Sequence, residues 1–426
     1  MTHNYKARIR KVLSTLKASG KHQALVVSSN PSAIKSADQH HTYRANSDLF
    51  YLTGITAPDV TLVVRTSQAP HVVIVAPAKD PVRILWEGPQ PPLNKFASGI
   101  GAQLLHSTEP RKAVRELLSG CETVYTQGFA GTVSGAMRAE IAKLTSEAAR
   151  NSPHTVGSAE TFLAPLRLIK SPSEVSALQE AAEVTGEVLH AVLPLIEPGT
   201  SEREVAALID YYYRLCGGTP GFETIVATGP SAATLHYHAL SRTIKNGDLL
   251  LLDTGIELGL YNADISRTIP VGDISEAQGV IYDAVLRAQN AAIKKVTHNA
   301  LIRDVYLAAA KELTIGLKEV GVLKGQLSTL MEKGAYKPYF PHGIGHSLGI
   351  DVHDVGGLRG NQEARLQKGT VFTIEPGLYF SKATKHLPPC GVRIEDDVVV
   401  TTNGCKNLTD RVFPKDRKAI AEAMAR

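Results

Sequence analysis

The sequence predicts two domains, an α/β domain over residues 1–165 and an α+β domain over residues 166–426. The first observation is length, because 426 residues exceed what a single hydrophobic core usually organises. The second is that short β-rich runs alternate with helical patterns in the first third of the chain. The third is that the later part opens with helices and then becomes rich in strands.

The elements of the first domain follow from local patterns. A first helix that packs on a sheet is predicted by apolar residues at helical spacing: Ile9, Val12, Leu13 and Leu16. Turn signals then separate three apolar runs, ALVVSS, DVTLVVRT and HVVIVAP, each of which predicts a strand. Helical patterns follow over residues 110–118 and 136–146.

The boundary is predicted near residue 165, where the segment LRLIKSPSEV begins. Ser171 and Glu174 have the spacing of a helix N-cap and its reciprocal partner, so they predict the start of a long amphipathic helix. Two more helices are expected over residues 275–296 and 302–320, where they would form an outer layer on the strands.

Composition limits the classes of function. The formal net charge of +5 is spread along the chain, which argues against a nucleic-acid partner. We expect no membrane partner, because no apolar run has the length of a bilayer span and the N-terminus lacks a secretory core. That basic N-terminus is slightly similar to a mitochondrial presequence, but its helical spacing favours a structural helix. Four cysteines without metal-binding spacing favour reduced thiols in the cytoplasm.

Two aspartates of the second domain are predicted to meet at a hairpin. Asp253 ends the apolar run GDLLLLDTG, where a buried carboxylate is costly unless it is paired or bound to a metal. Asp264 follows the segment GIELGLY, whose Gly255 and Gly259 favour a turn. On these two residues alone, a metal site and a surface position for Asp264 are equally open.

A glycine-rich segment, PHGIGHSLGIDVHD, contributes His342, His346 and His353. The glycines permit tight backbone paths that let imidazoles approach one centre. A single histidine here would more often be structural, whereas three beside the acids favour a metal ligand surrounded by polar site residues. His236, in ATLHYHAL, is a weaker candidate, and His238 is expected to be exposed.

Glu375 and Glu395 complete the set of carboxylates. Glu375 stands at a strand end, and Glu395 lies in VRIEDD, where alone it would be assigned to an exposed acidic edge. Arg393 lies two residues before Glu395, so in a strand both face the same side and the arginine can orient the carboxylate. Four carboxylates and one imidazole suit two divalent cations. The chain is therefore predicted to be a dinuclear metallohydrolase.

With the ligand types in the order Asp, Asp, His, Glu, Glu, the chain resembles the pita-bread metallopeptidases, the family of methionine aminopeptidase, aminopeptidase P, prolidase and creatinase. YRANSDLFYLTG, residues 43–54, is similar to the N-terminal signature of aminopeptidase P, and LRLIKSPSEV is similar to its interdomain linker. The C-terminal LTDRVFPKDRKAIAEAM also fits. The resemblance covers essentially the whole chain, and it implies a creatinase-like α/β N-terminal domain followed by an α+β pita-bread catalytic domain.

Carried over residue by residue, the resemblance implies that Asp253 binds one metal, that His346 and Glu375 bind the other, and that Asp264 and Glu395 bridge the two. Glu375 would also be catalytic. Further catalytic and substrate-binding roles fall to a second group: His236, His342, His353, Tyr379 and Arg393. The cofactor would be two divalent ions, manganese by family likeness, although carboxylate-rich ligation does not exclude cobalt, zinc or iron. The substrate would be a peptide with proline in second position, and the assembly a homodimer or homotetramer.

Three activities stay open. An Xaa-Pro aminopeptidase is favoured, because the interval from Glu375 to Glu395 resembles aminopeptidase P more than archaeal-type prolidase. An Xaa-Pro dipeptidase would need a cation for the free C-terminal carboxylate, and SKATKHLPPC offers three candidates: Lys382, Lys385 and His386. A metal-free binding homologue is disfavoured because all five ligand types are present.

Overall fold

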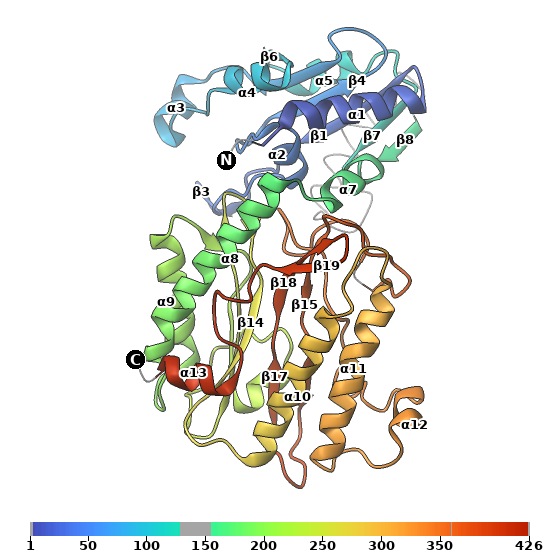
Figure 1. The fold of residues 1–426 in the computed structure, drawn as a ribbon. Coiled ribbons are helices and arrows are strands. Elements are labelled where there is room, and N and C mark those ends of the chain that lie inside the picture. The colour runs from blue at the N-terminus through green and yellow to red at the C-terminus, as the bar shows by residue number, and fades with distance from the viewer. Residues whose placement is uncertain (1–2, 128–154, 359, 425–426) are drawn as a thin grey trace. The chain divides into compact units, whose positions relative to one another are not determined.

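The structure is a computed structural model that describes residues 3–127, 155–358 and 360–424. The chain divides into two compact units, Thr2–Arg167 and Leu168–Arg426. They run from blue to green and from green to red in Figure 1. Each unit has its own strands and its own hydrophobic core. Within the described residues, no helix is long and apolar enough to cross a membrane.

The first unit contains a mixed sheet in the order β6-β5-β4-β1-β7-β8. The pairs β1–β4 and β4–β5 are antiparallel, while β5–β6, β1–β7 and β7–β8 are parallel. The three predicted strands are confirmed as β1, β4 and β5, whose interior positions are buried. The strand bounds are β1 Gln23–Ser28, β4 Thr61–Arg65, β5 Val72–Pro77, β6 Gln103–Ser107, β7 Thr123–Thr126 and β8 Thr155–Ser158.

Helices and a short hairpin complete the first unit. The predicted first helix is confirmed as α1, in which Ile9, Val12 and Leu16 are buried and Leu13 is partly buried. The pattern over residues 110–118 is confirmed as α5, and the pattern over residues 136–146 lies outside the described residues. The bounds are α1 Tyr5–Ser19, β2 Ile34–Ser36, β3 Gln39–His40, α2 Ser47–Thr53, α3 Pro81–Glu87, α4 Leu93–Ile100, α5 Pro110–Leu117 and α7 Glu160–Leu168.

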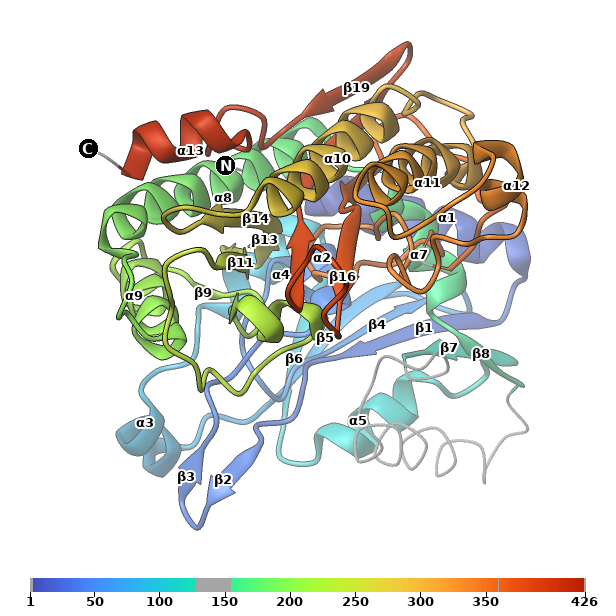
Figure 2. The ribbon, with the colours of Figure 1, turned by 90° about the horizontal axis from the view of Figure 1, so that it is seen from below.

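Long helices form one layer of the second unit. The predicted start of the long helix α8 is confirmed, because the Glu174 carboxylate accepts a hydrogen bond from the Ser171 N–H at 2.9 Å. Figures 1 and 2 show α8, α10 and α11 along one face of the strands. The predicted outer helices are confirmed as α10 and α11. The bounds are α8 Pro172–Val192, η1 Leu193–Leu195, α9 Glu202–Leu215, α10 Glu276–Ile293, α11 Ile302–Glu319, α12 Leu327–Glu332 and α13 Arg417–Met424.

The strands of the second unit form small antiparallel sheets in the orders β10-β11-β14, β13-β12-β9, β15-β18-β19 and β16-β17. Strands β11, β14, β15 and β17 are buried along almost their whole length, although β14 and β17 carry polar residues and only β11 and β15 are largely apolar in the sequence. The bounds are β9 Thr219–Pro220, β10 Ile225–Thr228, η2 Gly229–Ala233, β11 Leu249–Thr254, β12 Ile256–Leu258, β13 Tyr261–Asn262, β14 Ile265–Pro270, β15 Val371–Ile374, β16 Gly377–Phe380, β17 Cys390–Arg393, β18 Asp396–Thr401 and β19 Gly404–Asn407.

Candidate metal centre

The hairpin predicted between Asp253 and Asp264 is confirmed. Strand β12 pairs with β13 across a tight turn at Gly259 and Leu260, both of which have positive φ values, 56° and 71°. Gly255 permits the chain to fold back, because a Cβ there would collide with the carbonyl oxygen of Ala263. The returning chain enters β14, so Asp264 lies next to the end of β11 that carries Asp253.

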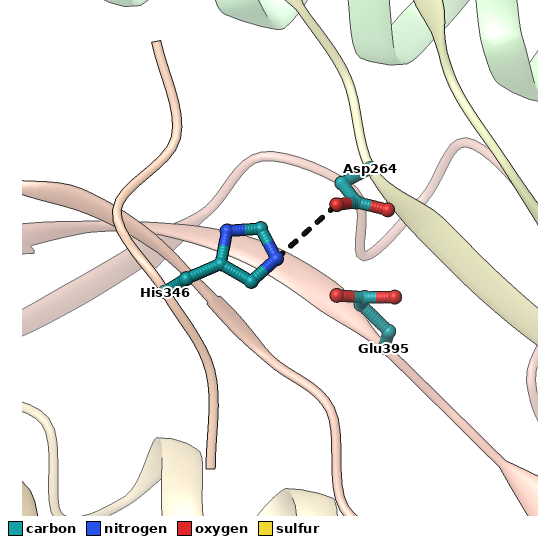
Figure 3. A group of neighbouring side chains, drawn as sticks. All are labelled: Asp264, His346 and Glu395. Atoms are coloured by element: carbon teal, nitrogen blue, oxygen red, sulfur yellow. Dashed lines mark ion pairs between the residues drawn. The ribbon is translucent and has the colours of Figure 1, made fainter. Parts of the chain in front are cut away.

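Three residues from distant parts of the chain meet in one buried cluster. One potential ligand atom from each of Asp264, His346 and Glu395 lies within 4.8 Å of the others, and all three residues are buried. Figure 3 shows the His346 ring pointing at Asp264, with Nε2 3.4 Å from Oδ2, and the Glu395 carboxylate beside them. The cluster therefore presents an imidazole nitrogen and carboxylate oxygens to a common point.

The backbone beside β15 positions His346 and Glu375. The His346 carbonyl oxygen accepts from the Thr373 N–H at 2.9 Å, and the Glu375 N–H donates to the Ile344 carbonyl oxygen at the same distance. Gly345 permits this close approach, because a Cβ there would collide with the Thr373 carbonyl oxygen. As a result, His346 Nε2 lies 3.7 Å from Glu375 Oε1.

The tautomer of His346 suits metal binding. Its Nδ1 lies 3.2 Å from the carbonyl oxygen of Ser347, and a carbonyl oxygen can only accept, so Nδ1 carries the proton. In the neutral imidazole, the Nε2 lone pair then points into the space beside Asp264 and Glu375, where a cation could accept it. A backbone carbonyl that fixes the tautomer of a ligand histidine in this way is common in metal sites.

The carboxylates of the cluster are electrostatically unfavourable without a cation. Burial and the neighbouring Glu395 and Asp253 carboxylates raise the pKa of Asp264 well above its usual value. Burial and the Glu375 and Asp253 carboxylates likewise raise the pKa of Glu395. Such shifts mean that these carboxylates bind protons unless a nearby positive charge takes the place of those protons.

Arg393 supplies part of that positive charge on one side of the cluster. Its Nη2 donates to Asp253 Oδ2 at 2.6 Å, and its Nε donates to Ser266 Oγ at 2.8 Å. Ser266 in turn donates to Glu395 Oε2 at 2.7 Å. Burial alone would lower the pKa of Arg393, but Tyr379 and the Asp253 and Glu395 carboxylates raise it well above its usual value. The arginine therefore stays charged and fixes Asp253 directly and Glu395 through Ser266.

The remaining donor atoms fit divalent cations. Asp253 Oδ1 is buried and has no hydrogen-bond partner among the described residues, although a buried carboxylate oxygen normally has one. Carboxylate oxygens with one imidazole are ligands that divalent cations accept. Cations at this position would satisfy Asp253 Oδ1 and relieve the repulsion between Asp264 and Glu395.

His342 and Tyr379 lie beside the cluster. His342 Nε2 is 2.9 Å from the Tyr379 hydroxyl oxygen. That oxygen accepts a hydrogen bond from Arg393 Nη1 at 3.1 Å. Burial lowers the pKa of His342, and burial raises the pKa of Tyr379 to about 12. Both groups are therefore neutral near pH 7. Nδ1 of His342 lies 2.9 Å from the Gly343 carbonyl oxygen and donates to it, so Nε2 accepts from the Tyr379 hydroxyl.

The predicted site residues surround one cavity of about 1090 Å³. Nearly all of them line it, including the ligand set and four further residues: His236, His342, His353 and Arg393. Tyr379 contacts the lining residues His342 and Arg393. The His353 ring packs edge-on against His346, with ring centroids 4.3 Å apart. His238, expected to be exposed, is exposed and lies 3.2 Å from Glu223, although both also line the cavity.

Three features of the site were not predicted from the sequence. Ser266 joins Arg393 to Glu395 through hydrogen bonds. The only feature of the sequence that could have indicated Ser266 is its position two residues after Asp264, which places both on one side of an extended chain. A second feature is the buried ion pair between Lys170 Nζ and Asp354 Oδ2, 2.9 Å apart with both side chains at most 2% exposed. The third is a cavity wall from α11 and the segment after α12, described below. Periodicity gives no signal for the last two.

Comparisons with known proteins agree with this geometry. Residues 176–402 match the model of metallopeptidase family M24, and residues 5–125 match that of the aminopeptidase P N-terminal domain. The chain is 32% identical to the Xaa-Pro aminopeptidase of Escherichia coli K12 over 94% of both chains. Among solved structures, it is similar to proline aminopeptidase P II from Yersinia pestis, with a TM-score of 0.90, 32% identity and full coverage of both chains. It is also similar to aminopeptidase P from E. coli with the inhibitor Pro-Leu, with a TM-score of 0.89, 30% identity and coverage of 99% and 98%.

The match to the catalytic-domain model spans more than half of the chain, and the relatives align along nearly its whole length. The predicted fold, a creatinase-like α/β domain before an α+β pita-bread domain, is thereby confirmed. This protein belongs to metallopeptidase family M24, and its catalytic domain follows an aminopeptidase P N-terminal domain.

Proposed function

We propose that the protein is a metal-dependent Xaa-Pro aminopeptidase, which cleaves the bond between an N-terminal residue and a following proline. One observation carries the proposal: the buried cluster of Asp264, His346 and Glu395 lines a large cavity in a chain similar throughout to enzymes of that name. The relatives give the dipeptidase alternative no support. The two family models match residues 5–125 and 176–402, and these ranges support the proposed domains, residues 1–165 and 166–426.

The proposed ligand set would hold two cations. Asp253 would bind one, His346 and Glu375 the other, and Asp264 and Glu395 both. The short distances from His346 Nε2 to Asp264 and Glu375 support this division. Bound cations of this kind polarise a carbonyl group and lower the pKa of water. Manganese is the metal we propose, and the oxygen-rich donor set supports a hard cation without distinguishing manganese from others.

The chain's own residues would then bind the substrate and move the proton. Glu375 lies beside the cluster at 20% side-chain exposure, so its carboxylate can accept a proton from the attacking water and deliver it to the leaving proline nitrogen. His353 and His236 line the same cavity, and one or the other would donate a hydrogen bond to the oxyanion that forms on the scissile carbonyl.

Further residues would shape the proline pocket. His342 and His353 line the cavity and would contact the proline ring. Tyr379 fixes the orientation of His342, and Arg393 fixes that of Asp253. A peptide bond to proline has no N–H, so this pocket would recognise the ring by shape rather than by a hydrogen bond to the amide.

Location and assembly are also proposals. Four cysteines without disulfide bonds support the cytoplasm, where thiols stay reduced. We propose a homodimer or homotetramer on the family resemblance, and light scattering on the purified protein would test it. We propose that neither nucleic acid nor a membrane is a partner, which the mild and dispersed charge supports.

Peptide cleavage tests the proposed activity. The purified protein, treated with chelator and supplied with manganese, should release alanine from Ala-Pro-Ala and from longer Ala-Pro peptides. Chelator alone should abolish the activity, and metal analysis should find two ions per chain. Rapid cleavage of Ala-Pro with refusal of every longer peptide would show a dipeptidase instead. No cleavage of either substrate at full metal content would refute the proposed function.

A further inference from the structure

The cavity extends beyond the metal centre to a wall that the catalytic assignment does not use. This wall comes from α11 and from the segment that follows α12, and its residues include Arg303, Tyr306, Tyr336, Lys337 and Phe340. In Figures 1 and 2, α11 and α12 lie on one flank of the strands and α9 on the other. A peptide held at the metal centre therefore has a second surface to contact.

A row of aromatic rings connects this wall to the catalytic residues. Tyr336 contacts Tyr306 at a centroid distance of 6.1 Å, and Tyr306 stacks on Phe340 at 5.2 Å and 17°. Phe340 then meets His342 edge-on at 4.9 Å. Phe340 and Tyr336 are 0% and 3% exposed, so they form a packed backing that leads from His342, beside Glu375, toward the turn that carries Lys337. Tyr306 is partly exposed, so it is the ring of this row that a residue following proline in a peptide can contact.

The backbone around Lys337 is held in a hydrogen-bonded turn. The Lys337 N–H donates to the Gly334 carbonyl oxygen at 3.0 Å, and the Phe340 N–H donates to that of Tyr336 at 3.0 Å. The Lys337 stem lies against Gly334, since a Cβ on that glycine would be 3.0 Å from the lysine Cε. The Tyr379 N–H donates to the Tyr339 carbonyl oxygen, which ties the turn to β16. The backbone that carries Lys337 is therefore held in place, while the side chain itself is exposed.

Charge distinguishes Lys337 from the other cations of the cavity. Arg303 Nη1 is 2.6 Å from Glu363 Oε1, and Arg393 Nη2 is 2.6 Å from Asp253 Oδ2. Within the described part of the chain, Lys337 forms no ion pair or hydrogen bond through its ammonium group, although it lines the cavity. The three candidate cations predicted from the sequence, Lys382, Lys385 and His386, are exposed and lie outside the cavity lining that the structure describes. Lys337 is thus available to a negatively charged part of a ligand.

We propose that Lys337 receives the free C-terminal carboxylate of short Xaa-Pro peptides, which makes them preferred substrates. The inference rests on the proposed function, which places the scissile bond at the metal centre. Proline then lies against His342, the following residue passes the partly exposed Tyr306, and the chain end reaches the ammonium group. Because Lys337 is exposed, its contribution should have the size of a solvent-accessible ion pair.

The test compares free acids with amides. Steady-state kcat/KM is measured for Ala-Pro-Ala and Ala-Pro-Ala-Ala, each with a free and with an amidated C-terminus. The wild type should prefer the acid about two- to fivefold for at least one length, as for exposed ion pairs, and added salt should reduce that preference. Lys337→Gln should abolish the preference, Lys337→Arg should retain it, and Lys337→Glu should reverse it. Lys333→Gln removes a nearby exposed cation that is not part of the described cavity lining, and it should behave as the wild type.

The outcomes separate the inference from the proposed function. Equal rates on acids and amides in the wild type would overturn the role of Lys337 while leaving the aminopeptidase activity established. A preference that survives in Lys337→Gln would also overturn it and would assign the carboxylate to another cation. If none of the four peptides is cleaved by the metal-loaded wild type, the proposed function itself fails.

Discussion

Removing Lys170 should destabilise the protein strongly, because the buried carboxylate of Asp354 would lose the cation that faces it. Lys170 Nζ lies 2.9 Å from Asp354 Oδ2, and the two side chains are only 1% and 2% exposed. Loss of one partner of such a pair costs about 3–5 kcal/mol. For a domain of 150–250 residues, each kcal/mol shifts Tm by about 2–4 °C, so Lys170→Met should lower Tm by about 6–20 °C.

The effect should reach the active site through the histidine loop. Asp354 directly follows His353, and its N–H donates to the Ser347 carbonyl oxygen at 2.8 Å. We therefore expect kcat on Ala-Pro-Ala to fall in Lys170→Met even at temperatures well below its Tm. Differential scanning calorimetry of the metal-loaded protein gives Tm, and activity at 25 °C gives kcat.

Two control variants isolate the cause. The double variant Lys170→Met with Asp354→Leu removes both charges, and its Tm should return toward that of the wild type. Lys418→Met breaks a pair whose side chains are 88% and 62% exposed, so its Tm should change little. A Tm of Lys170→Met within about 2 °C of the wild type would refute the reasoning. A double variant as unstable as the single one would do so as well.

The remaining predictions concern the metal centre. Asp264→Asn or Glu395→Gln should lose at least one metal and most activity, since each is proposed to bridge both ions; two ions per chain with normal turnover would exclude bridging. His353→Ala should lower kcat by about 10²–10³ with near-normal metal content; metal loss would make it a ligand, and unchanged kcat would leave it a structural residue. Burial and neighbouring acids raise the pKa of Asp264 and of Glu395, so the folded metal-free protein binds more protons than the unfolded chain. Its stability should therefore fall as pH rises from about 4, the unfolded value, through the raised values. The increase in Tm on adding manganese should grow over the same range, and a pH-independent increase would contradict this.

The hairpin and the histidine loop show what local sequence determined. The run GDLLLLDTG predicted a buried strand ending in an acid, and Gly255 and Gly259 predicted the turn that follows. The glycines around His346 predicted a close backbone path, which the structure shows at Gly345 beside Thr373. These features depend on a few neighbouring residues, so patterns of polarity and backbone freedom are enough to predict them. The order of the ligand types then identified the family.

Contacts between distant segments were decided only by the tertiary structure. Ser266 and Arg393 are 127 positions apart, and Lys170 and Asp354 are 184 apart. Neither pair has a local period or motif, because hydrogen bonds between separate strands and loops depend on how the elements pack. The cavity wall that carries Lys337 likewise depends on how α11 and the segment after α12 pack, which no local pattern predicts. The sequence by itself thus determined the elements, the ligand types and their order, whereas tertiary packing decided which side chains orient those ligands and which cations line the cavity.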